Sequence, residues 1–299
     1  MTPWFPASPR LKIGTSMINK IAVIGAGTMG HGIAQVAAMA EYHVALYDIQ
    51  QDFVDRGLES IRKNLAKGVE KGKVAPEVMD TSINRITGTT DLAAAAHQAQ
   101  LVIEAIPERL ELKTDLFGKL EELCDEGCIF GSNTSSLSIA KIAASTKRPD
   151  KFIGMHFFNP VHIMKLLEIV VAPETSDATL AAIKEVGSKL GKDCIVVKDF
   201  PGFATSRLGV CLGLEAIRMV EQGVASAEDI DKAMTLGYAH PMGPLKLTDL
   251  VGLDVRLNIA DYLHNELGSE VFNAPQLMRQ MVEEGKLGKK SGQGFYKWD

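Results

Sequence analysis

The chain has 299 residues, of which 46% are hydrophobic, and its formal net charge is −5. That length is enough for two domains with sizeable cores, while the acidic balance argues against a general nucleic-acid-binding surface. No uninterrupted apolar stretch approaches the roughly 18 residues that a membrane span requires. We therefore expect neither nucleic acid nor a membrane to be a partner of this chain.

Residues 1–17 precede the first regular pattern. They contain three prolines and two basic residues, but no continuous apolar core of the kind that a secretory signal needs. We expect a disordered leader here and a cytoplasmic protein. A short segment that targets an organelle is the alternative interpretation.

A dinucleotide-binding motif opens the folded chain. The apolar run 21–24 predicts a buried strand, residues 31–40 a helix, and residues 44–47 a second strand. The turn between the first strand and the helix is predicted to bind a cofactor pyrophosphate through Gly25, Ala26, Gly27, Thr28, Met29 and Gly30. The alternative is a glycine-rich turn without a ligand, but the flanking strand and helix are the context that the motif requires.

Three glycines and one carboxylate decide the chemistry of this motif. Gly25 permits a tight turn, Gly27 leaves room for a phosphate, and Gly30 lets the helix pack closely on the sheet. Asp48 ends the second strand, where it could accept hydrogen bonds from the adenosine ribose hydroxyls and would repel a 2′-phosphate. The sequence therefore predicts NAD rather than NADP as the cofactor.

Residues 18–200 alternate apolar runs with helical segments, which predicts an α/β domain with a Rossmann-like, mostly parallel sheet. Helices are expected at 52–73, 110–123, 139–145 and 178–190, and strands at 101–105, 128–131 and 194–197. The apolar segments 152–158 and 166–171 are separated by only seven residues. Because that is too short for a helical crossover, they should pair antiparallel at the end of the sheet.

This antiparallel pair would bring two chemistry-bearing residues together. In a hairpin symmetric about His162, His156 and Glu168 lie directly opposite one another, with Cβ atoms roughly 5 Å apart. The carboxylate could then fix the tautomer of the imidazole and stabilise its protonated form, as a general base requires. Spacing alone leaves the alternative open, namely a buried structural histidine beside an unrelated glutamate.

Residues 201–299 show helical patterns only, after the break at residues 199–202. The predicted helices are 204–222, 227–236, 254–267 and 276–284. The first is apolar around most of its circumference, which predicts an all-α dimerisation domain and a homodimer. The residues behind that prediction are Val210, Cys211, Leu214, Ile217, Met219 and Val220.

No metal site is expected. The four cysteines show no C-x-x-C spacing, and the histidines show no H-x-x-x-H spacing. Cysteines of this kind are usually small buried hydrophobic residues in a reducing compartment.

Four further strings follow the glycine-rich turn in a characteristic order. They occupy residues 132–137 (SNTSSL), 156–160 (HFFNP), 201–203 (PGF) and 290–296 (KSGQGFY). With them the chain resembles the 3-hydroxyacyl-CoA dehydrogenase family from about residue 19 to residue 298, and most closely its short-chain bacterial members, the 3-hydroxybutyryl-CoA dehydrogenases. The resemblance implies reversible, NAD-dependent oxidation of an (S)-3-hydroxyacyl-CoA to the 3-oxoacyl-CoA, in a cleft between an NAD-binding domain and a helical dimerisation domain.

The resemblance also implies catalytic roles. His156 would be the general base and Glu168 the carboxylate that orients it. Ser135 and Asn159 would hydrogen-bond the reacting oxygen or the thioester carbonyl and the nearby cofactor. From the residues alone, Ser135 could instead be a turn residue at the end of a strand.

Three charged residues match family positions that contact the cofactor. These are Glu108, Lys113 and Lys290. Without the resemblance, each would be interpreted as a solvated surface charge.

The CoA ester is expected to contact two places. Ser60 and Lys67, on the basic face of the helix at 52–73, match family positions that contact CoA, although such a face is often merely solvated. Ser206 stands where the family commonly has Asn. Since a hydroxyl is shorter than an amide and has one donor hydrogen, this difference puts the substrate preference in doubt.

Two other functions fit parts of the pattern. One is NAD-dependent oxidation of a different 3-hydroxy acid on the same fold, against which the basic helix face argues. The other is a non-catalytic, crystallin-like structural protein, against which the joint presence of Ser135, His156, Asn159 and Glu168 argues.

Overall fold

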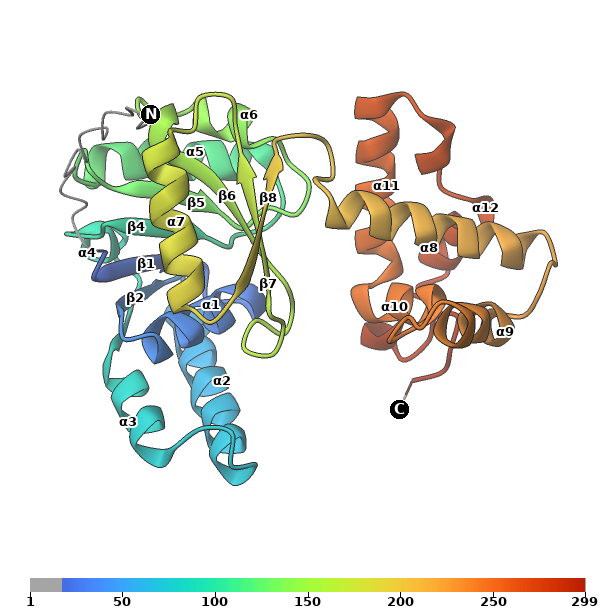
Figure 1. Cartoon of the computed structure of the whole chain (residues 1–299), viewed down its shortest axis with the longest axis horizontal. Helices are drawn as coiled ribbons and strands as arrows, with labels where there is room; N and C mark the ends of the chain where they lie inside the picture. The colour runs from blue at the N-terminus through green and yellow to red at the C-terminus, as the bar shows by residue number, and fades with distance from the viewer. Residues whose placement is uncertain (1–17, 299) are drawn as a thin grey trace, which may run out of the picture.

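A computed structural model describes residues 18–298 of the chain, so the leader expected at residues 1–17 lies outside the described residues. Figure 1 shows an α/β part with a central sheet, residues 18–200, beside a helical part, residues 201–298. Over the described range, no helix combines the length and the apolar character needed to cross a bilayer.

One eight-stranded sheet has the order β3-β2-β1-β4-β5-β6-β7-β8. The strands are β1 Lys20–Ile24, β2 His43–Tyr47, β3 Ile86–Thr89, β4 Leu101–Glu104, β5 Ile129–Ser132, β6 Phe152–Phe157, β7 Leu166–Val171 and β8 Asp193–Lys198. All neighbouring pairs are parallel except β6 and β7. This confirms the predicted mostly parallel sheet with an antiparallel pair near its end.

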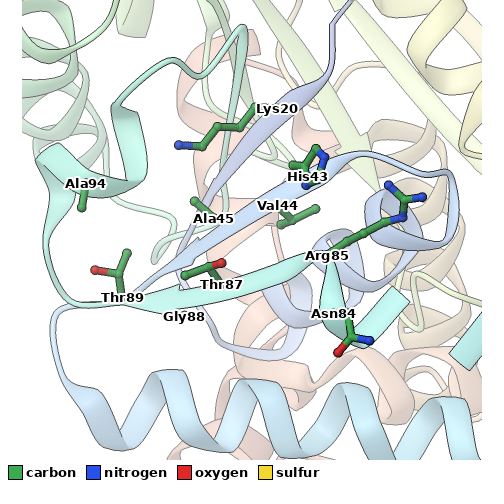
Figure 2. A pocket seen from close by; sticks show the side chains of 10 residues that line it. All are labelled: Lys20, His43, Val44, Ala45, Asn84, Arg85, Thr87, Gly88, Thr89 and Ala94. Atoms are coloured by element: carbon green, nitrogen blue, oxygen red, sulfur yellow. The ribbon is translucent and has the colours of Figure 1, made fainter. Parts of the chain in front are cut away.

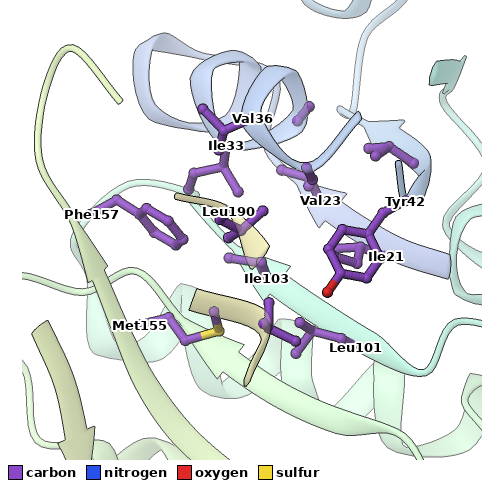
Figure 3. Close-up of a cluster of buried hydrophobic side chains, with 14 of the residues drawn as sticks. Ile21, Val23, Ile33, Val36, Tyr42, Leu101, Ile103, Met155, Phe157 and Leu190 are labelled. Atoms are coloured by element: carbon purple, nitrogen blue, oxygen red, sulfur yellow. The ribbon is translucent and has the colours of Figure 1, made fainter. Parts of the chain in front are cut away.

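Helices cover both faces of the sheet, as buried parallel strands require. They are α1 Thr28–Met39, α2 Gln51–Glu70, α3 Pro76–Asn84, α4 Leu92–Ala96, α5 Leu110–Leu123, α6 Ile139–Ala143, the short turn Pro149–Lys151 and α7 Asp177–Lys189. The core under α1, α2 and α7 places Ile33 and Val36 of α1 over Val23 and Ile103 of the sheet (Figure 3). Helices α4, α5 and α6 enclose the second core on the opposite face, around Phe130.

The helical part has a core of its own. Its elements are α8 Thr205–Glu221, α9 Ala227–Lys232, the π-helical turn Ala233–Gly237, α10 Pro244–Val251, α11 Leu253–Leu267, the turn Glu270–Phe272, α12 Gln276–Glu283 and the turn Lys289–Ser291. Figure 1 shows α8 beginning on the side that faces the sheet.

The apolar face of α8 was expected to contact a second subunit, but it packs mainly within its own chain. Val210, Leu214 and Ile217 are at most 3% exposed because they form the core of the helical part. Cys211, Met219 and Val220 pack against the same core. For Val210, Leu214 and Ile217 the prediction of an open surface covered by a second subunit was therefore wrong, because neighbouring helices of the same chain bury them. The other three side chains remain partly exposed.

Candidate active site

The glycine-rich turn between β1 and α1 has room for a pyrophosphate. Gly25 has a φ of +103°, and a Cβ on Gly30 would lie 1.6 Å from the Gly25 carbonyl oxygen, so both positions require glycine. A Cβ built on Gly27 meets no atom within 4 Å. Gly27 is the N-cap of α1 and has no side chain to cap the helix, which leaves first-turn N–H groups available to an anion.

Asp48 lies beside this turn. One carboxylate oxygen accepts a hydrogen bond from the Ala26 amide at 2.7 Å, and the other accepts one from the Ile49 amide, also at 2.7 Å. Thr28 and Met29 are the first two residues of α1. The turn and the carboxylate thus occupy neighbouring positions at the carboxyl ends of β1 and β2, as the motif predicts.

The antiparallel pair β6 and β7 places His156 directly opposite Glu168, as expected. The Nδ1 atom of His156 lies 2.8 Å from Oε2 of Glu168, and both residues are buried. Because an ionised carboxylate can only accept, Nδ1 carries a proton, and in the neutral form of the ring Nε2 then keeps its lone pair. The imidazole ring also packs against Phe158, with 4.4 Å between the ring centroids.

Glu168 receives four hydrogen bonds, three of them from the start of the helical part. Its Oε1 accepts from the Ala204 and Thr205 amides at 2.9 and 3.1 Å, and its Oε2 accepts from the Thr205 hydroxyl at 2.6 Å. Burial alone would raise the pKa of Glu168, but the hydrogen bonds from His156, Thr205 and Ala204 hold that pKa below its usual value. The carboxylate is therefore kept ionised beside the imidazole.

A second buried cluster lies at the carboxyl ends of β4 and β5. Glu104 accepts hydrogen bonds from the Lys113 ammonium at 2.5 Å and from the Ser132 hydroxyl at 2.6 Å. Burial raises the pKa of Glu104, which Lys113 and Ser132 oppose. Lys113 is only 1% exposed, so its interpretation as a solvated surface charge was wrong.

Glu108 holds the turn that carries Ser135. One of its oxygens accepts hydrogen bonds from the Thr134 hydroxyl at 2.6 Å and from the Ser135 and Ser136 amides at 2.8 and 3.1 Å. The other oxygen lies 3.3 Å from the Lys113 ammonium. Burial alone would raise the pKa of Glu108, but Lys113 and these donors hold it below its usual value.

Ser206 also reaches this turn. Its hydroxyl donates to the Ser135 carbonyl at 2.9 Å, which links the helical part to the α/β part. Asn159 follows β6 and is exposed, while Asn133 accepts a hydrogen bond from the Phe157 amide at 2.9 Å. The ends of β5 and β6 therefore bring Ser135, Asn159 and His156 to one edge of the sheet.

Three predicted residues lie away from this edge. The Lys290 ammonium pairs with Asp254 within the helical part, and no contact of the described residues supports its predicted role at the cofactor. Ser60 and Lys67 lie on α2, which together with α3 projects from the sheet (Figure 1). Lys67 is exposed, whereas the Ser60 hydroxyl donates to the Arg56 carbonyl at 2.8 Å.

A cavity lies elsewhere, along the edge of the sheet formed by β2 and β3. Figure 2 shows its lining, which includes Lys20, His43 and Thr87 but none of the predicted site residues. Among residues 18–298, no group of three or more His, Cys, Asp or Glu side chains is arranged to hold a metal ion.

Sequence reasoning missed two residues of the site. Glu104 could have been found, because it ends a buried parallel strand, and ligands of open α/β sheets bind at that edge. Thr205 gave no signal, since nothing in the sequence relates it to a carboxylate 37 residues earlier.

An open helix terminus beside a carboxylate, at the sheet edge that also carries a paired imidazole, is the arrangement of a dinucleotide-dependent dehydrogenase. Residues 20–200 match the family model described as 3-hydroxyacyl-CoA dehydrogenase, NAD binding domain, and residues 202–298 match its C-terminal domain. The chain therefore belongs to the 3-hydroxyacyl-CoA dehydrogenase family, and it is an NAD-dependent oxidoreductase.

Individual relatives agree with this assignment. The chain is 45% identical over 282 residues to the probable 3-hydroxybutyryl-CoA dehydrogenase of Bacillus subtilis, covering 94% of this chain and 98% of that one. It is similar to the crystal structure of FadB2 from Mycobacterium tuberculosis, with a TM-score of 0.92 and 42% identity, and to that of (S)-3-hydroxybutyryl-CoA dehydrogenase PaaH1 from Ralstonia eutropha, with a TM-score of 0.90 and 39% identity. Both matches cover 94% of this chain and 99% of the other.

Proposed function

We propose that the chain interconverts (S)-3-hydroxybutyryl-CoA, or a similar short-chain ester, and the corresponding 3-oxoacyl-CoA. The observation that carries this proposal is the buried His156–Glu168 pair at the same sheet edge as the glycine-rich turn. The substrates named for the Bacillus and Ralstonia relatives support the short acyl chain.

His156 acts as the general base. Its Nε2 lone pair accepts the proton of the substrate 3-hydroxyl. NAD, when held by the glycine-rich turn, would supply the acceptor for the hydride that leaves carbon 3 of the substrate. The imidazolium that forms is stabilised by Glu168 through the 2.8 Å contact to Nδ1. In the reverse direction, His156 returns this proton to the carbonyl oxygen.

The turn held by Glu108 positions the substrate. We assign the Ser135 hydroxyl, which donates to Glu108 at 3.2 Å, and the Asn159 amide as donors to the reacting oxygen or the thioester carbonyl of the substrate. The Ser206 hydroxyl supports the turn from the helical part. Because Glu108 binds two amides of this turn, it fixes Ser135 before the substrate arrives.

The cofactor is held by the glycine-rich turn and its neighbours. We assign the pyrophosphate to residues 25–30 and the adenosine ribose to Asp48, which favours NAD over NADP. Glu108 binds Ser135 and is paired with Lys113, and we assign both charged residues to the nicotinamide ribose.

The basic face of α2 contacts the CoA phosphates in this proposal. Lys63 and Lys67 are exposed and lie one turn apart, and Ser60 lies one turn before Lys63 on the same face. A free 3-hydroxy acid would have no use for this face, which favours the CoA ester over the second candidate substrate.

We further propose that the active form is a homodimer joined through residues 201–299. Large apolar side chains remain exposed there, and a second copy of the chain would cover them. They include Leu208, Leu247, Leu250, Val251 and Val255. Light scattering should give about twice the chain mass of 32.3 kDa, whereas a monomer at micromolar concentration would contradict this arrangement.

A cytoplasmic location is the remaining part of the proposal and rests on the four free cysteines.

Steady-state rates test the reaction. Acetoacetyl-CoA with NADH should be reduced with a higher kcat/KM than 3-oxoacyl-CoA esters of eight or more carbons, and free acetoacetate should be a much poorer substrate. A kcat/KM for acetoacetate equal to that for its CoA ester would favour a different 3-hydroxy acid. Failure to reduce any of these compounds would contradict the enzymatic function.

A further inference from the structure

Two hydrogen bonds converge on a single oxygen of the catalytic pair. Oε2 of Glu168 accepts from His156 Nδ1 at 2.8 Å and from the Thr205 hydroxyl at 2.6 Å. His156 belongs to β6 in the α/β part, whereas Thr205 is the first residue of α8. The pair is therefore completed by a side chain from the beginning of the helical part.

We propose that Thr205 is a positioning residue that sets the proton affinity of the His156–Glu168 pair. The proposal rests on the role of His156 as general base. A hydroxyl that donates to Oε2 neutralises part of the carboxylate charge, so less of that charge stabilises the imidazolium. Without this donor, the same oxygen interacts more strongly with Nδ1–H and His156 holds its proton more tightly.

No other charged side chain around Glu168 in the described residues competes with the effect of the Thr205 hydroxyl on the proton affinity of the pair. Among residues 18–298, the His156 imidazole is the one ionisable side chain that pairs with the Glu168 carboxylate. The register partner on β8 is the apolar Ile195. From α8, Arg207 directs its guanidinium over the Phe200 ring, 5.3 Å from the centroid. The remaining contacts come from the Ala204 and Thr205 amides, which side-chain substitution of Thr205 leaves in place.

Thr205→Val removes the hydroxyl and keeps the branched shape. Oxidation requires neutral His156 and reduction requires the protonated form, so a tighter proton moves both pH profiles in the same direction. We expect the acid limb of the oxidation profile and the basic limb of the reduction profile each to shift upward by about 0.5 to 1 pH unit. Well above its acid limb, oxidation should keep a kcat within about twofold of wild type.

A purely structural defect gives a different result, because it lowers both rates at every pH. Thr205→Ser retains the donor and should restore the wild-type profiles. Thr179→Val is the control: it removes a hydrogen-bonded hydroxyl of the same residue type, which donates to the Asp150 carbonyl away from the site. This control should leave both limbs in place.

The proposal is overturned if Thr205→Val folds and its limbs lie within about 0.2 pH unit of wild type or shift downward. If that variant does not fold by circular dichroism, Thr205→Ala undergoes the same measurement. Failure of the proposed function is distinguishable, since wild-type turnover would then persist in His156→Gln.

An NMR titration of the His156 ring gives an independent measurement. The ring signal is identified by its loss in His156→Gln, and its titration midpoint should shift upward in Thr205→Val. An unchanged midpoint would contradict the proposal.

Discussion

The α/β part and the helical part both bury carboxylates, but with different kinds of partner. In the helical part, Asp249 accepts hydrogen bonds from the Phe295 and Tyr296 amides and the Trp298 indole, which fixes the end of the chain. In the α/β part, Glu168 faces an imidazole that can change its charge. A buried carboxylate satisfied by fixed donors serves architecture, whereas one opposite a titratable ring serves proton transfer.

Glu104, a third buried carboxylate, has both a fixed and an ionisable partner in the α/β part. It binds a fixed amide, that of Ile106 at 2.8 Å, as well as the ammonium of Lys113. Because Lys113 reaches Glu108 in turn, this cluster supports the Ser135 turn. In the proposed function, the same sheet edge therefore carries proton transfer at β6 and β7 and substrate positioning at β4 and β5.

The largest expected effect comes from the titratable partner itself. His156→Gln should lower turnover by about 10² to 10⁴, the range for loss of a positioned proton acceptor, while NADH still binds. Stopped-flow turnover and NADH fluorescence titration measure the two properties. A turnover within threefold of wild type would show that His156 is not the proton acceptor, and Glu168 would then have no special role among the buried carboxylates.

Charge at the cofactor turn should have the next largest effect. Asp48→Asn keeps an acceptor for the Ala26 amide but loses the charge that would repel a 2′-phosphate. We expect the preference for NADH over NADPH, as a ratio of kcat/KM, to fall about tenfold. Equal efficiencies with both cofactors in the wild type would show that Asp48 does not discriminate between them.

The basic face of α2 should contribute more weakly, since it is exposed and screened by salt. Lys67→Glu is expected to raise the KM for acetoacetyl-CoA by several-fold at low ionic strength, with kcat unchanged. Lys119→Glu, the same charge change on the exposed side of α5, is the matched control. If both variants have the same KM, the CoA phosphates lie elsewhere.

The smallest effect concerns acid stability. The pKa of Glu108 is held below its usual value in the folded chain, so its ionised form stabilises the fold above the ordinary pKa of 4.5, and this contribution is lost as the pH falls through the lower, folded value. The difference in unfolding free energy between wild type and Glu108→Gln should therefore be largest near neutral pH and shrink on acidification. A difference that stays constant down to acid unfolding would contradict the assignment.

The sequence predicted the parts of the molecule that local pattern determines. Buried apolar runs marked most strands, and the short connection between β6 and β7 fixed the register that joins His156 to Glu168. β3 was missed because its sequence, ITGT, has a single strongly apolar residue and lies at the edge of the sheet. Helices α3, α4 and α10 were also missed; α4 has only five residues, four of them alanine.

Long-range burial was the property that the sequence could not supply. Lys113 looked like a surface charge because nothing local shows that α5 turns it toward Glu104. The apolar circumference of α8 indicated burial but not by which partner, and the helices of its own chain proved to be the answer for Leu214 and Ile217. Thr205 acquires its role only when the two parts meet.

The partner of a buried carboxylate decides its role, and a comparison of two such carboxylates tests this directly. Glu168→Gln and Asp249→Asn remove one buried charge each while conserving volume, and the measurement is the single-turnover rate of acetoacetyl-CoA reduction per folded molecule. We predict a fall of at least tenfold for Glu168→Gln. For Asp249→Asn we predict an unchanged rate and a free energy of unfolding lowered by about 1–3 kcal/mol. A rate for Glu168→Gln equal to that of Asp249→Asn would contradict the account.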